Sequence, residues 1–323
     1  MNTIPHICFW GYGAVARAHI KRLKKLFPAI RLSHASHNGP HTGLPSFASF
    51  AESALSPDVD IVFITTPHAY HSELGVLAAR HGKHLIIEKP VTRTLFELDD
   101  LLKAVKEHGV RCTVAENYFY KPAYLEIKRI IEEGLIGTPM VLEMAQTKRP
   151  AITGWRTDAA LMGGGALLEG GVHWIDALLT ICGGNPTEVL AVKPDVPVQT
   201  NIPFEDTSLV LAKFSNGMIA KLTYSWRIPN RFFGLGLSKV YGSDGVITFE
   251  SNGLFLSVYG KKKIKKIFAP FGFTGYRDML KNFVDDYMSG HDWKPGMDRI
   301  LMEMQLIDAA YRSMESGRFE RLV

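Results

Sequence analysis

Short apolar runs alternate with helix-patterned segments along the first third of the chain. The runs are typical of buried strands, and the segments between them repeat apolar residues at helical spacing. We expect strands at residues 4–10, 30–35, 59–65, 84–87 and 111–115, and helices at residues 14–26, 47–55, 70–81 and 95–108. Gly82 and Gly109 follow two of these helices and are typical C-terminal stops. This alternation predicts an α/β Rossmann fold with a doubly wound parallel sheet.

The pattern changes after residue 120. We expect helices at residues 122–133, 160–181 and 297–313, and strands at residues 188–192, 208–214, 219–226, 235–241, 246–249, 254–258 and 263–268. Turn signals at Asn216-Gly217 and Ser243-Asp244-Gly245 separate several of the strands. The second half therefore predicts an antiparallel meander in an α+β domain. We place the domain boundary between residues 1–120 and 121–323.

Composition narrows the classes of protein that fit. A chain of 323 residues is long enough for two domains with real cores. The net charge of +5 does not single out nucleic acid, and no apolar run is long enough to span a membrane. Cys8, Cys112 and Cys182 are far apart and form no C-x-x-C pair, which argues against disulfides and zinc. With no secretory signal, we expect a cytoplasmic protein without a metal site.

A glycine turn joins the first strand to the first helix. Its spacing is G-x-G-x-x-A, a variant of the dinucleotide fingerprint. Gly11 permits the tight turn, Gly13 lets the backbone approach a pyrophosphate, and Ala16 lets the helix pack on the strand. The helix N-terminus then offers free N–H groups to phosphates. A plain tight turn is the alternative. The residues expected to bind the cofactor here are Gly11, Tyr12, Gly13, Ala14 and Val15.

Two later strands also end in polar residues. In an open α/β sheet, ligands bind outside the carboxyl ends of the strands, so the loops after residues 64 and 87 should line the same crevice as the glycine turn. Lys89 could reach a bound substrate there, or it could be a surface lysine in a turn. His71 could face the nicotinamide or simply begin a helix. The residues expected to bind the cofactor in these loops are Thr65, Thr66, Pro67, His68, His71, Glu88 and Lys89.

The end of the second strand bears on the choice between NAD(H) and NADP(H). NAD-selective sites usually carry Asp or Glu there for the ribose 2′-hydroxyl. This chain has no Asp or Glu in the region before Glu52, and Ser36, His37 and Asn38 could donate to a 2′-phosphate. The loop has no arginine, so the case for a phosphate is incomplete. The pattern favours NADP(H), with Ser36 and His37 as cofactor-binding residues.

A second cluster of titratable residues lies in the glycine-rich helical stretch. Glu169, His173 and Asp176 are spaced to share one helical face. Gly170 and Gly171 lower the stability of that helix. A close approach of cofactor or substrate to the backbone would explain why glycine stands at these positions. An imidazole suits proton exchange with a hydroxyl near neutral pH. The alternatives are a surface ion pair or a metal site, although the spacing is not H-E-x-x-H.

Together these motifs resemble the glucose–fructose oxidoreductase, inositol dehydrogenase and MocA (Gfo/Idh/MocA) family over nearly the whole chain. The resemblance rests on residues 11–16, 66–71, 82–90, 134–137 and 163–176. It implies an open-faced, mainly antiparallel C-terminal sheet used for ligand contact and for homo-oligomer contact as a dimer or tetramer. It also implies that Lys89 is the substrate-side lysine and His173 the acid/base. Glu169 stands where the family usually has aspartate.

Further residues are candidates for substrate contact. The last strand of the first domain leads into Glu116-Asn117-Tyr118, where Phe119 and Tyr120 stand in place of the family's usual arginine. Aromatic residues here would suit a sugar ring face or a less polar substrate. Arg156 could contact substrate or form a structural salt bridge, and His19 is expected to serve packing. The expected substrate residues are Asn117, Tyr118, Arg156 and Asp176.

The sequence thus predicts an NAD(P)-dependent oxidoreductase acting on a sugar, cyclitol or keto-sugar. Lys89, His173 and Glu169 are its expected catalytic residues. The alternative is a non-catalytic NAD(P)-binding regulatory protein with the same fold. A regulator would be free to lose Lys89 or His173, and this chain keeps both. The sequence does not select the substrate or the physiological direction.

Overall fold

The structure is a computed structural model that describes residues 3–36, 43–196, 203–230, 235–270 and 272–322. The chain forms two compact units. The first unit comprises Met1–Glu116, Ala160–Gly163 and Arg277–Leu301, and the second unit comprises Asn117–Ala159, Gly164–Tyr276 and Met302–Val323. A single boundary at residue 120 was expected. In the structure, two segments from beyond this boundary, residues 160–163 and 277–301, belong to the first unit.

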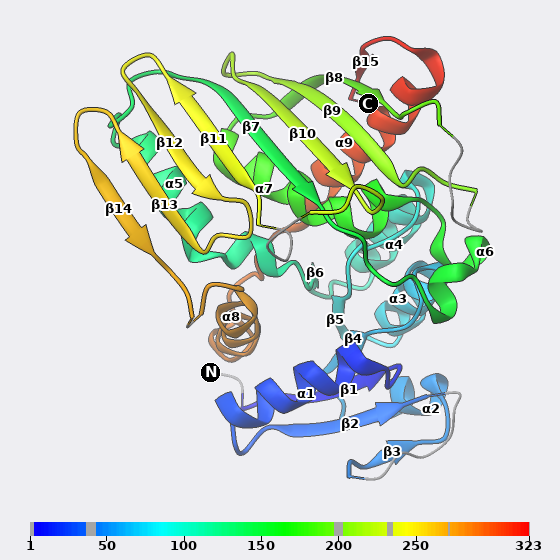
Figure 1. Ribbon diagram of the computed structural model, residues 1–323. Coiled ribbons are helices and arrows are strands. Elements are labelled where there is room, and N and C mark those ends of the chain that lie inside the picture. The colour runs from blue at the N-terminus through cyan, green and yellow to red at the C-terminus, as the bar shows by residue number, and fades with distance from the viewer. Residues whose placement is uncertain (1–2, 37–42, 197–202, 231–234, 271, 323) are drawn as a thin grey trace. The chain divides into compact units, whose positions relative to one another are not determined.

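The first unit contains a six-stranded sheet in the order β3-β2-β1-β4-β5-β6 (Figure 1). All of its strand pairs are parallel, as the alternating sequence pattern predicted. This order is typical of a Rossmann fold, in which the direction of winding reverses beside β1. The strands are β1 His6–Trp10, β2 Arg31–Ala35, β3 Ser46–Phe47, β4 Ile61–Ile64, β5 His84–Ile87 and β6 Cys112–Val114.

Helices follow the strands of this sheet at the predicted positions. They are α1 Ala14–Leu26, α2 Phe50–Leu55, α3 His71–Arg80 and α4 Leu95–Glu107. Ser49 and Thr94 cap α2 and α4, because each side chain accepts the amide of the glutamate three residues on. The core beneath them is aromatic, with Phe9 and Phe63 stacked at 4.9 Å between ring centroids.

Helix α8, Tyr276–Ser289, was missed by the sequence analysis. Met279, Leu280, Phe283, Val284 and Tyr287 are buried at helical spacing, so the signal was present. From Arg277 onward it belongs to the first unit, where Arg111 donates to the carbonyl oxygens of Asp286 and His291 at 3.1 and 2.7 Å. The last helix is α9, Met297–Ser316.

The second unit contains a nine-stranded sheet in the order β14-β13-β12-β11-β7-β10-β9-β8-β15 (Figure 1). Most neighbours are antiparallel, as predicted, but β7 and β10 are parallel. The strands are β7 Pro139–Thr147, β8 Pro186–Val192, β9 Thr207–Phe214, β10 Ile219–Ser225, β11 Leu237–Gly242, β12 Gly245–Glu250, β13 Phe255–Tyr259, β14 Ile264–Ile267 and β15 Glu320–Arg321.

The simple meander predicted for these strands is wrong at one point. Strands β10 and β11 follow each other in the chain but are not neighbours, because β7 lies between them. The sequence analysis missed β7. Its residues alternate between buried and half-exposed positions, but Met, Glu, Ala and Gln have weak strand preferences.

The helical stretch predicted at residues 160–181 is broken in the structure. It consists of α6, Ala159–Met162, a π-helical turn, Leu167–Gly171, and α7, Val172–Cys182. Helix α7 packs against β7, β10 and α5, Pro122–Glu132. It is apolar nearly all round, as expected of a helix buried in a core.

Candidate active site

The carboxyl ends of β1, β4 and β5 carry three of the predicted site loops. Backbone hydrogen bonds continue just beyond the strands, from Thr65 N to Trp10 O at 2.8 Å and from Glu88 N to Ile64 O at 2.9 Å. The Thr65 hydroxyl also donates to the carbonyl oxygen of Gly11 at 3.0 Å. The structure therefore brings the glycine turn, the Thr65–His68 loop and the Glu88–Pro90 loop to one edge of the sheet.

The glycine turn has the geometry that a dinucleotide requires. Gly11 has φ +95°, and a β-carbon there would lie 3.0 Å from the Thr65 carbonyl oxygen. A β-carbon on Gly13 would have open space around it, so the backbone is accessible at this position. Helix α1 begins next, without a side-chain cap and without an acidic residue in its first turn. Its first N–H groups suit a pyrophosphate, so the residues present fit the predicted cofactor.

The end of β2 carries no acidic residue within the described part of this loop. Ala35 ends the strand and Ser36 follows it, half-buried. His37 and Asn38, which were also expected to be able to donate to a 2′-phosphate, lie outside the described residues. Glu52 is engaged in the cap of α2, where its carboxylate accepts the amide of Ala48 at 2.6 Å. The carboxylate typical of NAD-selective sites is therefore not supplied by Glu52.

Buried histidine side chains form hydrogen bonds with backbone carbonyl oxygens in and around the loops that follow β4 and β5. The ring nitrogens of His71 lie 2.8 Å from the carbonyl oxygen of Pro90 and 2.9 Å from that of Thr66, and burial lowers the pKa of His71. His71 also begins α3 and is fully buried. Its side chain therefore contacts the backbone of both loops and links the loop after β4 to the loop after β5. His68 donates to the carbonyl oxygen of Met162 at 3.0 Å.

Glu88 is anchored by His19 of α1, which the sequence analysis had assigned to packing. The His19 ring stacks on Phe63, and its Nε2 lies 2.7 Å from Glu88 Oε1. Burial works to raise the pKa of Glu88, but the hydrogen bond and charge of His19, together with the charges of Lys89 and His71, outweigh it, and the pKa is lowered. This contact fixes the residue before Lys89, which is itself half-buried at the strand end.

His173 occupies a distinctive position in the second unit. The other residues of α7 are all buried, and His173 is the one member that keeps exposed surface. It is the second residue after the π-helical turn that contains Glu169. π-Helical turns inside α-helices frequently mark functional sites. A buried helix that opens to solvent through one imidazole is a candidate for proton exchange.

The two glycines before His173 are explained by packing within the protein. A β-carbon on Gly170 would collide with the Tyr224 hydroxyl of β10. A β-carbon on Gly171 would lie 3.0 Å from the Leu167 side chain. The sequence analysis suggested a close approach by cofactor or substrate, and the structure supplies a different reason at Gly170.

Glu169 is held by an ion pair. Its Oε1 accepts a hydrogen bond from Arg156 Nε at 2.8 Å, and the Arg156 guanidinium also lies over the Trp155 ring at 4.6 Å. The salt bridge that the sequence analysis left open for Arg156 is thus present, and its partner is the predicted catalytic carboxylate. Asp176, the third member of the cluster, is fully buried.

The segment after β6 brings aromatic residues to His173. The Tyr118 ring is stacked on the His173 imidazole, with 4.6 Å between centroids and 14° between planes. Asn117 is buried and donates to the carbonyl oxygen of Thr274 at 2.6 Å. Of the predicted substrate residues, Tyr118 is therefore the one that the structure places against the imidazole.

Sequence reasoning missed Glu205, which holds the start of the π-helical turn. Its Oε1 accepts the amide of Leu167 at 2.8 Å and the Tyr311 hydroxyl at 3.1 Å, and its backbone oxygen accepts the amide of Ala166 at 2.8 Å. Burial raises the pKa of Glu205 to about 7. A β-carbon on Gly165 would collide with Glu205. The glycine run was the only signal of this contact.

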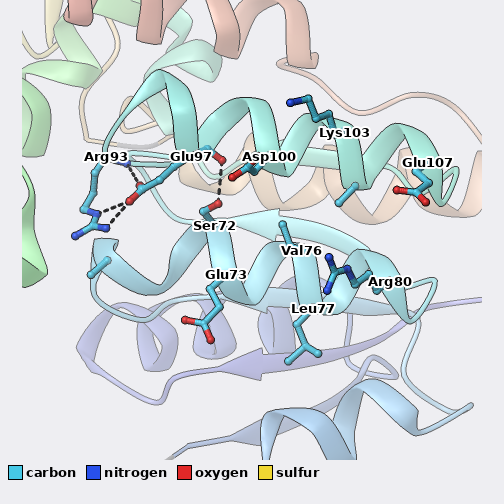
Figure 2. Close-up of a pocket in the computed structure, with 12 residues that line it drawn as sticks. Ser72, Glu73, Val76, Leu77, Arg80, Arg93, Glu97, Asp100, Lys103 and Glu107 are labelled. Atoms are coloured by element: carbon cyan, nitrogen blue, oxygen red, sulfur yellow. Dashed lines mark hydrogen bonds and ion pairs between the residues drawn. The ribbon is translucent and has the colours of Figure 1, made fainter.

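A groove of about 780 Å³ runs between α3 and α4 of the first unit. Figure 2 shows Arg93 turned onto Glu97 and the Ser72 hydroxyl donating to the Glu97 backbone. Its lining residues carry charges of both signs, and the predicted cofactor residues are not among them. The groove is therefore separate from the candidate site.

Within the described residues, no group of three or more His, Cys, Asp or Glu side chains is arranged to hold a metal ion. None of the helices in the described ranges combines the length and apolar character that a membrane crossing requires.

Comparisons with known proteins bear on both units. The model "Oxidoreductase family, NAD-binding Rossmann fold" matches residues 6–116, and the model "GFO/IDH/MocA C-terminal domain" matches residues 124–248. The chain is 35% identical over 176 residues to the uncharacterized oxidoreductase YrbE of Bacillus subtilis. It is 29% identical over 202 residues to 1,5-anhydro-D-fructose reductase of Ensifer adhaerens.

Both sequence similarities cover only part of the related proteins. They cover 52% and 62% of this chain and 49% and 60% of the two relatives, so the chain matches about half of their length. A solved structure of levoglucosan dehydrogenase in complex with NADH and levoglucosan has a TM-score of 0.87 at 22% identity, covering 98% of this chain and 99% of that chain. This likeness shows the fold of both units. With family models matched in its N-terminal and C-terminal parts, the chain belongs to the Gfo/Idh/MocA family of NAD-binding oxidoreductases.

Proposed function

We propose that this chain is an NAD(P)-dependent oxidoreductase that transfers hydride between nicotinamide and a carbinol or carbonyl carbon of a sugar, cyclitol or keto-sugar. The observation that carries the proposal is His173, the single residue through which the buried helix α7 reaches solvent. The dinucleotide geometry of Gly11 and Gly13 supports the cofactor. Two of the similar proteins are named for sugar derivatives, 1,5-anhydro-D-fructose and levoglucosan.

The bound nicotinamide supplies the hydride acceptor or donor, and the protein supplies orientation and proton transfer. In the oxidative direction, His173 takes the proton from the substrate hydroxyl as the carbon loses its hydride, and it returns that proton in reduction. Lys89 donates a hydrogen bond to the same oxygen and stabilises its developing negative charge. Glu169 either orients the His173 imidazole or binds a further substrate hydroxyl. Its carboxylate accepts a hydrogen bond from Arg156.

The test is turnover of a panel of sugars, inositols and keto-sugars, followed by absorbance of the reduced nicotinamide. We expect Lys89→Ala and His173→Ala each to lower kcat by at least about 100-fold while cofactor binding survives. Lys106→Ala and His108→Ala, at exposed positions at the end of α4, are matched controls and should keep full turnover. Near-normal turnover in both site variants would refute the assignment.

The same panel separates the enzyme from a regulatory protein. A non-catalytic NAD(P)-binding regulator would bind cofactor but give no absorbance change with any compound. Both Lys89 and His173 are kept in this chain, which favours the enzyme. Cofactor binding without turnover in either direction would favour the regulator.

We also propose a preference for NADP(H). The support is the absence of a carboxylate at the described end of β2 and the use of Glu52 as a helix cap. We expect NADPH to bind more tightly than NADH, and Ser36→Asp to weaken NADPH binding by about tenfold or more through repulsion of the 2′-phosphate. Paired dissociation constants provide the test, and a clear preference of the unaltered protein for NADH would contradict it.

The exposed side of the second sheet supports a homo-oligomer, as a dimer or tetramer. Leu209, Ile219 and Leu237 are exposed apolar residues on β9, β10 and β11. We expect light scattering to give a multiple of the chain mass, and Ile219→Glu to lower it. A monomer at all concentrations would contradict this proposal.

A further inference from the structure

We propose that Tyr118 is a positioning residue for the His173 imidazole and that Lys121 fixes the Tyr118 ring. The inference rests on the proposed function, in which His173 exchanges the substrate proton. It deepens that function by naming how the imidazole is held. All three residues belong to the second unit.

The first observation is the stack itself. The Tyr118 and His173 rings are nearly parallel, 14° apart, with centroids separated by 4.6 Å. The Trp174 ring is nearly perpendicular to the Tyr118 ring, at 79°, with 5.1 Å between the centroids. Such contacts between flat rings restrict rotation of both side chains. Tyr118 therefore fixes the plane of the imidazole from one side.

The second observation is a cation over the Tyr118 ring. Lys121 Nζ lies 3.8 Å from the ring centroid and donates to the carbonyl oxygen of Asn252 at 2.6 Å. Lys121 is only 3% exposed. Burial of an ammonium is unfavourable, and a ring face and a carbonyl oxygen offset part of that cost. The Tyr118 hydroxyl also lies 3.5 Å from Asn252 Oδ1, so Lys121 and Asn252 hold both the face and the tip of the tyrosine.

The arrangement assigns Tyr118 to the imidazole instead of the sugar. The sequence analysis expected aromatic residues here to meet a sugar ring face. The Tyr118 ring is already in contact with the His173 imidazole and with the Lys121 ammonium, which leaves less of its surface for a sugar. His173 is the open residue of α7 and would otherwise sample several rotamers. A proton acceptor must hold its nitrogen within hydrogen-bond reach of the substrate oxygen, and the stack provides that order.

Nuclear magnetic resonance tests the geometry without any substrate. In the full chain with ¹³C-labelled histidine, His173 is identified by the signal that His173→Asn removes. We expect the ring current of Tyr118 to shift this signal upfield, Tyr118→Phe to keep the shift and Tyr118→Leu to abolish it. Tyr259→Leu, at an exposed tyrosine of β13, is the matched control and should leave the signal unchanged.

Kinetics test the role, with the panel compound that the unaltered protein turns over fastest. We expect Tyr118→Leu to lower kcat by about tenfold or more, with KM and cofactor affinity nearly unchanged, and Tyr118→Phe to stay within about twofold. Lys121→Met should give a smaller loss of kcat. Melting temperatures identify variants that fail to fold. Tyr118→Phe keeps the ring, so it still tests the stack if Tyr118→Leu is unstable.

The outcomes separate the two proposals. An unshifted His173 signal in the unaltered protein, or a kcat for folded Tyr118→Leu within about twofold, overturns the inference and leaves the proposed function intact. Turnover that falls equally in Tyr118→Phe and Tyr118→Leu also overturns it. No turnover by the unaltered protein with any compound overturns the proposed function, and with it the catalytic role of the stack.

Discussion

The two units hold their candidate chemistry by different means. In the first unit, backbone hydrogen bonds from Thr65 and Glu88 extend the parallel sheet and place the loops directly at strand ends. The buried rings of His71 and His19 add side-chain contacts to this backbone framework. In the second unit, His173 and Glu169 depend on side chains from distant parts of the chain. Tyr118 stacks on the imidazole, Arg156 pairs with Glu169, and Glu205 holds the start of the turn.

The difference indicates which parts of the site tolerate change. A backbone-held loop is set by strand register and by glycines that need special conformations. A site held by side chains depends on single contacts that one substitution can remove. We therefore expect second-unit variants to alter stability strongly, and first-unit variants to act mainly on ligand binding.

The largest expected effect is the pH dependence due to Glu205. Its pKa is raised to about 7 in the folded protein, against a reference value of 4.5. Between these values the native state binds more protons than the unfolded chain, so stability falls as pH rises through this window and levels off above it. The loss should reach about 3 kcal/mol of unfolding free energy. Urea unfolding of the protein and of Glu205→Gln at pH 5 to 8 measures it.

Glu205→Gln is also the control for other titrating groups. Because glutamine does not titrate, the difference in unfolding free energy between the two proteins isolates Glu205. Parallel stability curves for the two proteins over this pH range would show that Glu205 is not held with a raised pKa.

A smaller loss is expected from Gly170→Ala. The added β-carbon would collide with the Tyr224 hydroxyl, and overpacking of this kind costs about 2 kcal/mol. Removing that hydroxyl in Gly170→Ala/Tyr224→Phe should recover part of the loss, although Trp226 then loses its hydrogen bond to Tyr224. Thermal unfolding measures each variant. A double variant no more stable than Gly170→Ala would show that another contact requires the glycine.

Unlike Gly170→Ala, Gly13→Ala in the first unit should leave stability nearly unchanged and weaken cofactor binding. A β-carbon at this position has open space around it, so the change in unfolding free energy should stay within about 0.5 kcal/mol. The same β-carbon would stand where the backbone approaches the pyrophosphate, and we expect the dissociation constant for NADPH to rise about tenfold. Calorimetric titration provides the measurement. Unchanged affinity would place the pyrophosphate elsewhere.

The smallest expected effect concerns Glu88 and His19. The lowered pKa of Glu88 means that its contribution to stability is present above the reference value of 4.5 and is lost as the pH falls below it. Glu88→Gln should cost about 1 kcal/mol near neutral pH and much less in acid. An equal cost at pH 3 and pH 7 in chemical unfolding would argue against an ionised Glu88.

The contrast between the units also explains what the sequence could predict. Most strand and helix positions in the first unit followed from apolar periodicity, although β3 and α8 were missed, and the glycine turn and Lys89 fell at strand ends as expected. Strand β7 was missed because its residues prefer helix, and the break at Gly163–Gly165 was hidden by an apolar pattern that continues through it. The Tyr118–His173 stack and the Glu205 contacts join residues far apart in the sequence, so no local pattern signals them.

The most direct test of the account is a crystal structure of the protein with cofactor and the fastest substrate of the panel. The account predicts that Lys89 Nζ and one ring nitrogen of His173 both lie within about 3.2 Å of the same substrate oxygen, beside the nicotinamide. A complex in which either side chain points away from that oxygen, or in which the two bind different oxygens, would contradict it.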